Sequence, residues 1–415
     1  MLLSNIAAFA TPVQNPEPDV SAPIRIGVAG LGRAFTLMLP TLTADARVRL
    51  VAGADPLPAA RDQFTRDFGG PAFADVEHLC ARSDVDLVYI ATPHQFHARH
   101  AALAFAHGKH VLLEKPMAIT LDECTAIIDA GISAGRALIV GHSHSFNRPV
   151  ARVREICELG SFGAVRMITA INFTEFLYRP RRPEELDTES GGGVIFSQGA
   201  HQIDIVRLVG GGRLSSVRAL TGAWDPSRPT EGAYSALLRF ESGAFAQATY
   251  SGYAHYDSDE LMDGIGEMGQ TKSPADYGAA RKRLDNAGEP VEEAALKAAR
   301  NYGGALYATP ARTTPKAWNH FGFLVVCCER ADLRPTAQGV VIYADRERTF
   351  ELLPPPAIPR VEVIDEIHSV VVDGEPPVHD GAWARATLEA CLAILASARE
   401  QRDIALSLQV ETVRG

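Results

Sequence analysis

The fold of the first half of the chain is decided by the stretch Ile24-Arg25-Ile26-Gly27-Val28-Ala29-Gly30-Leu31-Gly32-Arg33-Ala34-Phe35, a short strand pattern that runs into G-x-G-x-x-F. Gly30 permits a tight turn, and Gly32 lets the backbone approach a pyrophosphate whose charge the next helix N-terminus stabilises. Phe35 replaces the third glycine of the dinucleotide pattern, so we expect this helix to stand slightly further from the strand. The residues predicted to contact a dinucleotide are Gly30, Gly32, Arg33 and Ala34.

A second predicted strand, Val48 to Ala54, ends at an acidic residue, Asp55. Asp55 follows Gly30 by 25 residues (55 − 30 = 25). A carboxylate near this spacing accepts hydrogen bonds from the adenosine ribose and repels a 2′-phosphate. The pattern therefore favours NAD as cofactor, with NADP as the alternative. For Asp55 itself, the alternative interpretation is a helix cap before Pro56 and Pro58.

A third buried strand is predicted at Asp86-Leu87-Val88-Tyr89-Ile90-Ala91, and it closes on Thr92-Pro93. On the helix that follows, His94, His97 and His100 recur every three residues. A single helix cannot aim three such side chains at one ion without other ligands, so we expect no metal site here. Packing and first-turn hydrogen bonds are the expected roles, with Thr92, Pro93 and His97 on the cofactor side.

The run Val111-Leu112-Leu113-Glu114-Lys115-Pro116 is apolar and ends abruptly in a carboxylate, an ammonium and a proline. Its apolar part fits an interior parallel strand, which must stop at Pro116 because proline lacks the N–H that a strand needs. Lys115 is therefore held at the carboxyl end of a strand, where open parallel sheets bind ligands and a desolvated lysine can do acid–base chemistry. The alternative is a surface lysine in a turn, and the cofactor pattern upstream favours the catalytic interpretation.

Strand and helix patterns alternate as far as residue 147. Thr120-Leu121-Asp122-Glu123 is a capping box that starts a helix to about Ala134, and a further strand, 137–141, leads into His142. This alternation predicts a Rossmann domain with a doubly wound parallel sheet over residues 24–147. Residues 1–23 are expected to form a mobile arm.

Beyond Arg148 a helix is followed by strands without intervening helices, at 165–173, 214–221, 232–241, 244–251, 321–327, 339–344 and 349–353. Period-two alternation in them predicts an open, mainly antiparallel sheet within an α/β domain, 148–415, whose open face would meet the first domain. The polar segment 257–318 interrupts the strands and is expected to be an insertion serving as a lid or an interface. Helices at about 361–372 and 381–401 finish the chain.

A glycine-rich segment of the second half also carries polar residues suited to a site. It runs from Gly191-Gly192-Gly193 through Ser197 to Gly199-Ala200-His201-Gln202-Ile203-Asp204. A helix that starts near Gly199 places His201 in its first turn, with Asp204 three residues on and on the same face. Asp204 would then orient the imidazole and stabilise its charged form. The alternative is a buried structural histidine.

Composition narrows the class of protein. A chain of 415 residues exceeds one ordinary core, so two domains are expected. The net charge of −10 and pI near 5.7 argue against nucleic-acid and membrane partners. The six cysteines are scattered, without C-x-x-C spacing, which fits reduced thiols in a cytoplasmic protein. They are Cys80, Cys124, Cys157, Cys327, Cys328 and Cys391.

Taken together, these motifs resemble those of the glucose-fructose oxidoreductase / inositol dehydrogenase / MocA family. They are Gly30-x-Gly32, Ala91-Thr92-Pro93, Gly108-Lys109-His110-Val111 leading to Glu114-Lys115-Pro116, and Gly191-Gly192-Gly193 with Gly199-x-His201-x-x-Asp204. The resemblance implies NAD(P)-dependent oxidation of a hydroxyl group on a small molecule, without a metal, in dimers or tetramers that form through the open sheet. It also implies that Lys115 and His201 face the reacting hydroxyl.

The resemblance extends to further site residues. Glu114 and Lys115 are expected to contact the cofactor, and the expected substrate contacts are His142, Tyr178, Arg179, Ser197 and Asp204. Ser197 stands where inositol-type members carry an aspartate, so the usual lysine, aspartate and histidine trio is incomplete. The turn at Gly30 and the segment around Ser197 look most like the phthalate 4,5-cis-dihydrodiol (4,5-dihydroxyphthalate) dehydrogenase members.

Three functional hypotheses follow. The first is an NAD-linked dehydrogenase of a cis-dihydrodiol, in which guanidinium groups of Tyr178-Arg179-Pro180-Arg181-Arg182 bind substrate carboxylates. Against this, these arginines could pair with Glu184 and Glu185 in a solvated loop. The second hypothesis is a sugar or cyclitol dehydrogenase of the same fold. The third is a non-catalytic NAD-sensing protein.

Overall fold

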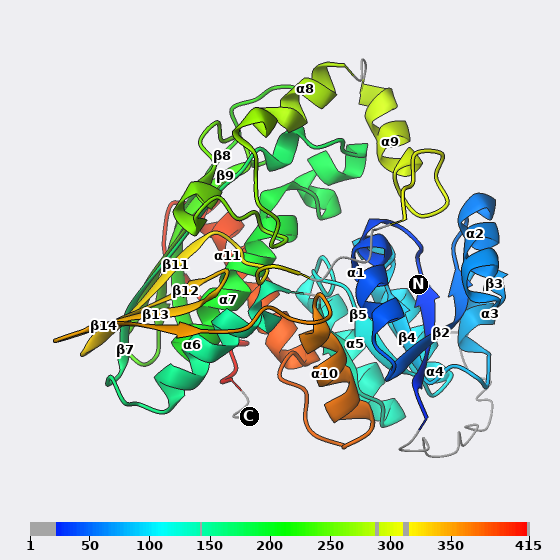
Figure 1. Ribbon diagram of the computed structural model, residues 1–415, viewed down its shortest axis with the longest axis horizontal. Coiled ribbons are helices and arrows are strands. Elements are labelled where there is room, and N and C mark those ends of the chain that lie inside the picture. The colour runs from blue at the N-terminus through cyan, green and yellow to red at the C-terminus, as the bar shows by residue number, and fades with distance from the viewer. Residues whose placement is uncertain (1–21, 142, 287–289, 310–314, 413–415) are drawn as a thin grey trace.

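The computed structural model describes residues 22–141, 143–286, 290–309 and 315–412. The predicted arm, apart from Ala22 and Pro23, and the predicted substrate contact His142 lie outside these residues. Two α/β bodies lie side by side (Figure 1), and each is built around one sheet. No helix among the described residues is long and apolar enough to cross a membrane.

The first body holds a six-stranded parallel sheet in the order β3-β2-β1-β4-β5-β6, which confirms the predicted Rossmann domain. Strands β4 and β5 are buried almost throughout because helices cover both faces of the sheet. The strands are β1 (Ile24–Ala29), β2 (Val48–Ala54), β3 (Ala72–Phe73), β4 (Leu87–Ile90), β5 (His110–Leu113) and β6 (Leu138–Val140). The helices are α1 (Arg33–Ala44), α2 (Pro58–Phe68), α3 (Val76–Cys80), α4 (His97–Ala106) and α5 (Leu121–Ala134).

The second body holds a nine-stranded sheet in the order β14-β13-β12-β11-β7-β10-β9-β8-β15. Every pairing is antiparallel except that of β7 with β10, so the prediction of a mainly antiparallel sheet is confirmed. The strands are β7 (Val165–Phe173), β8 (Leu214–Gly222), β9 (Ala233–Phe240), β10 (Phe245–Ser251), β11 (Phe323–Cys328), β12 (Ala331–Thr336), β13 (Gly339–Ala344), β14 (Arg348–Leu352) and β15 (Ile404–Ala405).

Helices α6 (Arg148–Glu158), α7 (Ala200–Gly210) and α11 (Gly381–Glu400) lie between this sheet and the Rossmann domain (Figure 1). Their apolar side chains form one core with the inner face of the sheet. The expectation that the open face of the sheet meets the first domain is therefore wrong. The helices cover the inner face, and the open face points away from the Rossmann domain.

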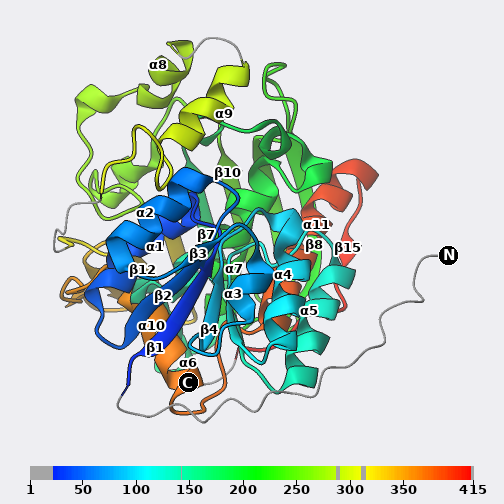
Figure 2. The ribbon, with the colours of Figure 1, turned by 90° about the vertical axis from the view of Figure 1, so that its right-hand side faces the viewer.

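Segment 257–318 contacts both bodies and carries α8 (Ala279–Asp285) and α9 (Pro290–Ala299), which lie at the top of the view in Figures 1 and 2. Tyr302 packs edge-on against Phe35 of α1, with ring centroids 5.2 Å apart, and its hydroxyl donates to Asp67 of α2 at 2.6 Å. Helix α10 (Val361–Val371) also returns to the Rossmann domain and packs into its core beside β1 and β2.

Candidate active site

The turn after β1 leaves a backbone surface open to a ligand. Gly30 has a φ of +93°, and a Cβ there would lie 2.7 Å from the Ala91 carbonyl oxygen. A Cβ at Gly32 would meet nothing within 4 Å. Helix α1 then begins without a side-chain cap and without an acidic residue in its first turn. Its N-terminal N–H groups, with Arg33 and Ala34 in the first turn, fit the pyrophosphate of a dinucleotide.

Asp55 lies beside this turn at the end of β2. Its carboxylate accepts hydrogen bonds from the N–H of Leu31 at 2.9 Å and from the N–H of Leu57, at the start of α2, at 2.8 Å. The second bond closes a turn before α2 and is not the helix cap considered as the alternative, because the N-cap of α2 is Leu57 and no side chain caps it. The first bond ties the carboxylate to the glycine turn, at the strand end from which an acidic residue selects NAD.

Two of the three histidines after β4, His97 and His100, make hydrogen bonds near the ends of the neighbouring strands, whereas His94 packs edge-on against His97. The His97 ring lies between the carbonyl oxygens of Thr92 and Pro116, at 2.9 and 3.0 Å, and thereby joins the segments that follow β4 and β5. His100 Nδ1 lies 3.0 Å from the Thr92 hydroxyl. In the described part of the chain, no three His, Cys, Asp or Glu side chains come together as a metal site.

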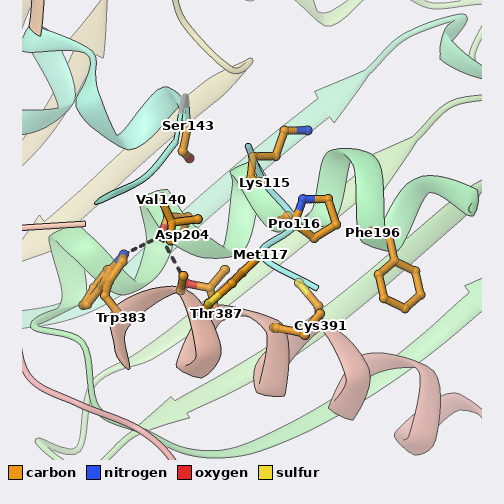
Figure 3. Close-up of a pocket in the computed structure, with 13 residues that line it drawn as sticks. Lys115, Pro116, Met117, Val140, Ser143, Phe196, Asp204, Trp383, Thr387 and Cys391 are labelled. Atoms are coloured by element: carbon orange, nitrogen blue, oxygen red, sulfur yellow. Dashed lines mark hydrogen bonds between the residues drawn. The ribbon is translucent and has the colours of Figure 1, made fainter. Parts of the chain in front are cut away.

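Lys115 is fixed at the end of β5 and reaches into the second domain. Its Nζ donates to the backbone carbonyl of Ser197 at 2.7 Å. Burial lowers the pKa of Lys115 to about 8, while the nearby carboxylates of Glu114 and Glu267 raise it. Figure 3 shows its ammonium pointing away from the Trp383 and Thr387 side of an apolar pocket. A lysine in this state can exchange a proton near neutral pH.

The Ser197 carbonyl belongs to a π-helical segment, Ile195–Gly199, which runs directly into α7. Helix α7 begins at Ala200, beside the predicted start near Gly199, and His201 lies in its first turn as predicted. π-Helical turns have altered hydrogen bonding and recur at functional sites. The Ser197 hydroxyl donates to the Gly193 carbonyl, so this residue reaches Lys115 through its backbone and not through the side chain predicted to contact substrate.

His201 lies four residues after Ser197, whose carbonyl accepts from Lys115 of the other domain. Its ring packs edge-on against His144, with centroids 4.8 Å apart, and against Phe321 at 5.1 Å. The Asn147 amide donates to His144 Nδ1 at 3.0 Å. His144 Nε2 faces the Oε1 of Glu267 at 3.1 Å. Burial lowers the pKa of His144, and the contact with His144 lowers the pKa of Glu267 to about 2.

Asp204 does not orient the His201 imidazole, and this prediction is wrong. Its Oδ1 accepts from the Trp383 indole at 2.5 Å and from the Thr387 hydroxyl at 3.1 Å (Figure 3), and its Oδ2 accepts from Ser145. All of these groups are buried. The carboxylate joins α7 to α11, which is a structural role and not the predicted substrate contact.

The three arginines that were predicted to bind substrate carboxylates make different contacts in the structure. Arg181 donates to the Phe176 carbonyl at 2.6 Å, and Arg182 pairs with Glu184 at 3.1 Å. Tyr178 donates to Asp225 at 3.0 Å. Arg179 is exposed and has no salt bridge within the described residues. The pairing alternative therefore holds for Arg181 and Arg182 but not for Arg179.

Sequence analysis missed Glu267 and His144. Glu267 lies in the segment interpreted as a lid or an interface, and its approach to the site depends on the fold of a distant hairpin. The run Gly264-Ile265-Gly266-Glu267-Met268-Gly269 does carry a turn signal, because three glycines surround the carboxylate. His144 follows β6 at the same sheet edge as Lys115 and could have been selected for that reason.

An open dinucleotide turn, an acidic residue at the end of β2 and a buried lysine facing a second domain define an NAD-dependent oxidoreductase of the Rossmann type. The chain belongs to the Gfo/Idh/MocA family. Residues 24–142 match its model "Oxidoreductase family, NAD-binding Rossmann fold", and residues 150–271 match its C-terminal domain.

Among curated proteins, the chain is 48% identical over 373 residues to 1-carboxy-3-chloro-3,4-dihydroxycyclohexa-1,5-diene dehydrogenase of Comamonas testosteroni, covering 90% of this chain and 94% of that protein. Among solved structures, a putative dehydrogenase from Bordetella bronchiseptica RB50 superposes with a TM-score of 0.86 at 40% identity, covering 92% of this chain and 100% of that one. The WlbA dehydrogenase of Bordetella pertussis, solved with NADH and UDP-GlcNAcA, shares the fold with a TM-score of 0.65 at 21% identity, covering 93% and 99%.

Proposed function

We propose that this enzyme oxidises a ring-carboxylated cyclohexadiene cis-diol with NAD and yields a catechol, with the phthalate 4,5-cis-dihydrodiol as a candidate substrate. The Comamonas relative, named for a carboxylated dihydroxycyclohexadiene, supports this class of substrate. The alternative substrates, sugars and cyclitols, carry no carboxylate and need no dedicated cation.

The observation that carries the proposal is the exposed, unbridged guanidinium of Arg179. Its positive charge acts on Arg33, at the start of the dinucleotide helix, and on Glu267 beside His144. Arg300, from segment 257–318, also lies near Arg33 and helps to lower the pKa of that residue. Three cations from three parts of the chain are therefore close enough for their charges to act on one another. Arginine binds carboxylates through two parallel N–H donors, which suits a benzoate-type or phthalate-type substrate.

Oxidation of the substrate hydroxyl requires a proton acceptor, which the enzyme must supply. When bound, NAD supplies the acceptor for a hydride from the carbinol carbon. Deprotonated Lys115 keeps one N–H on the Ser197 carbonyl and offers its lone pair to the substrate hydroxyl, whose proton it takes as the C=O bond forms. His201 is proposed to hydrogen-bond the same oxygen. The ketone then moves one ring proton to oxygen and becomes an aromatic catechol, which makes the oxidation strongly downhill.

The test is a turnover panel with NAD that contains mono- and dicarboxylated cyclohexadiene cis-diols, the uncarboxylated diol, inositols and sugars. We expect NADH formation with the carboxylated diols and a value of kcat/KM at least about tenfold lower without the carboxylate, the loss of one charge-assisted hydrogen-bonded contact. Equal or faster turnover of an inositol or a sugar would overturn the proposal. Thermal stabilisation by NAD without any turnover would favour the non-catalytic alternative.

We also propose that the enzyme assembles as a homodimer or homotetramer in the cytoplasm. The open face of the second sheet carries exposed Leu237 on β9 and, on adjacent β10 and β7, the register pair Phe245 and Met167. An apolar patch of this kind favours a protein interface. The cysteines in the described residues are all free thiols, which supports a reducing compartment.

A further inference from the structure

A short hairpin of the second domain carries a carboxylate whose charge acts on Lys115. Ile265 and Thr271 form an antiparallel bridge, and the N–H of Gly269 donates to the Gly266 carbonyl at 2.8 Å. This turn leaves Glu267 and Met268 at its tip. Two neighbours hold the tip in place, because the N–H of His320 donates to the Glu267 carbonyl at 3.1 Å and the Arg360 guanidinium lies 3.3 Å from the Met268 sulfur. The backbone of the tip is therefore fixed independently of the Glu267 side chain.

From this tip, the Glu267 carboxylate meets His144. The Nδ1 of His144 accepts from the Asn147 amide, so the proton of the neutral ring is on Nε2 and is donated to Glu267. The same imidazole forms the edge-on contact with His201. The side chains therefore contact one another in sequence: Glu267 of the hairpin contacts His144 after β6, and His144 contacts the predicted catalytic residue His201 of α7.

Glu267 also acts on the lysine through its charge. Among the described residues, the titratable or charged groups that face Lys115 are His94, Glu114, Arg181, Glu267 and Cys391. Those that face Glu267 are Lys115, His144, Arg179, Tyr250, His320 and Arg360. The surroundings of Glu267 are mainly cationic, and its depressed pKa keeps the carboxylate ionised throughout the neutral range.

We propose that Glu267 is a positioning residue for the oxidation: its carboxylate accepts the Nε2–H of His144, thereby holds the ring against which His201 rests, and adds a second negative charge to that of Glu114 near Lys115. This inference rests on the proposed function for its kinetic consequences. According to this proposal, Glu267 provides the acidic side chain that Ser197 cannot provide.

The experiment compares Glu267→Gln and Glu267→Asp with the control Glu260→Gln, which removes an exposed carboxylate from the same segment. The first readout is the pH dependence of Lys115 acetylation by acetic anhydride, followed by mass spectrometry without substrate. Loss of the carboxylate should lower the wild-type midpoint of about 8 by roughly one pH unit, whereas Glu267→Asp and Glu260→Gln should keep it. The second readout is the ¹⁵N signal of the His144 ring, in which the Nε2–H resonance should shift in Glu267→Gln, because its acceptor is no longer charged, and stay near the wild-type position in Glu267→Asp and Glu260→Gln.

Kinetics give the third readout. With the carboxylated diol, Glu267→Gln should lower kcat roughly tenfold or more with little change in KM, and it should move the rising limb of the pH profile to lower pH. An unchanged acetylation midpoint and an unchanged His144 signal in Glu267→Gln would overturn the inference. If the wild-type enzyme oxidises no carboxylated diol, the proposed function fails, but the labelling and NMR readouts still decide the role of Glu267.

Discussion

Lys115 meets two requirements of a general base, a pKa not far above neutral pH and a fixed position. Its buried position lowers its pKa to about 8, and the Ser197 carbonyl fixes its nitrogen. A base must be deprotonated to act, so kcat/KM should rise with pH through about 8. Lys115→Met should abolish this limb and lower kcat by about 10²–10⁴-fold. The exposed control Lys282→Met should keep both, and a pH profile that survives in Lys115→Met would contradict the assignment.

The proposed contact between Arg179 and a substrate carboxylate gives a second prediction. Arg179→Ala should raise KM for a ring carboxylate about tenfold or more, since a charge-assisted hydrogen bond contributes roughly 1.5–3 kcal/mol, and it should leave KM for NAD nearly unchanged. Arg182→Ala removes a neighbouring guanidinium that already pairs with Glu184 and should have a much smaller effect. Steady-state kinetics with a carboxylated diol decides between these outcomes. Equal effects of the two substitutions would count against a dedicated carboxylate contact.

Individual site residues were predictable where their role depends on nearby sequence. Gly30 and Lys115 are defined by the strand that precedes each of them. Asp204 was misassigned because its partner Trp383 lies 179 residues further along the chain. Glu267 was missed for the same reason, since His144 lies 123 residues before it. Sequence periodicity carries no information on such pairs.

At the scale of elements, hydrophobic periodicity located most strands and helices, and α5 and β7 have the predicted bounds. Strand β12 was not predicted. It contains Pro335, and proline normally argues against a strand because it cannot donate to the ladder. In the structure β12 still pairs with β13, and Pro335 lies opposite Val340. The rest of the strand supplies the pairing that proline cannot.

The loop before α11 is joined to α10 by a buried ion pair. His379 Nδ1 lies 2.7 Å from the Glu366 carboxylate. The contact with His379 lowers the pKa of Glu366 against the effect of burial, and the Glu366 charge raises the pKa of His379 against the same effect. The contribution of Glu366 to stability is present above its unfolded pKa of about 4.3 and is lost as the pH falls through its lowered folded pKa. The contribution of His379 is present below its unfolded pKa of about 6.5 and is lost as the pH rises through its raised folded pKa.

Glu366→Gln should therefore lower the free energy of unfolding by about 3 kcal/mol at pH 5 to 6, the lower end of the cost of breaking a buried ion pair. The difference from wild type should shrink above the raised pKa of His379. Urea unfolding at several pH values measures this, with the exposed Glu375→Gln as control. A difference that does not vary with pH would show that the pair contributes no charge–charge stabilisation.

The open face of the second sheet exposes the apolar side chains of Leu237, Phe245 and Met167, which we propose to lie in the subunit interface. Leu237→Asp and Phe245→Asp should convert the proposed dimer or tetramer to monomers, because each places a charge within the patch. Light scattering coupled to size-exclusion chromatography measures the mass. Leu159→Asp, at a still more exposed apolar residue at the end of α6, should leave the assembly intact. A monomeric wild-type enzyme would contradict the proposal.

The domain arrangement was only partly predictable from sequence. Alternating patterns indicated a parallel sheet followed by an antiparallel one, but they did not show which face of the second sheet the helices cover. Segment 257–318 also bridges both bodies through Tyr302 and Asp67, which are 235 residues apart. Packing between distant segments decides both features.

The contact between Lys115 and the Ser197 carbonyl has a consequence for how this enzyme can diverge. Every amino acid carries a main-chain carbonyl, so codon changes at position 197 leave the lysine anchored as long as the helical distortion around it persists. Natural selection can therefore alter the side chain there without disturbing the contact that fixes the proposed proton acceptor. Related enzymes can therefore differ in the side chain at position 197 and still keep the contact between the lysine and the main-chain carbonyl.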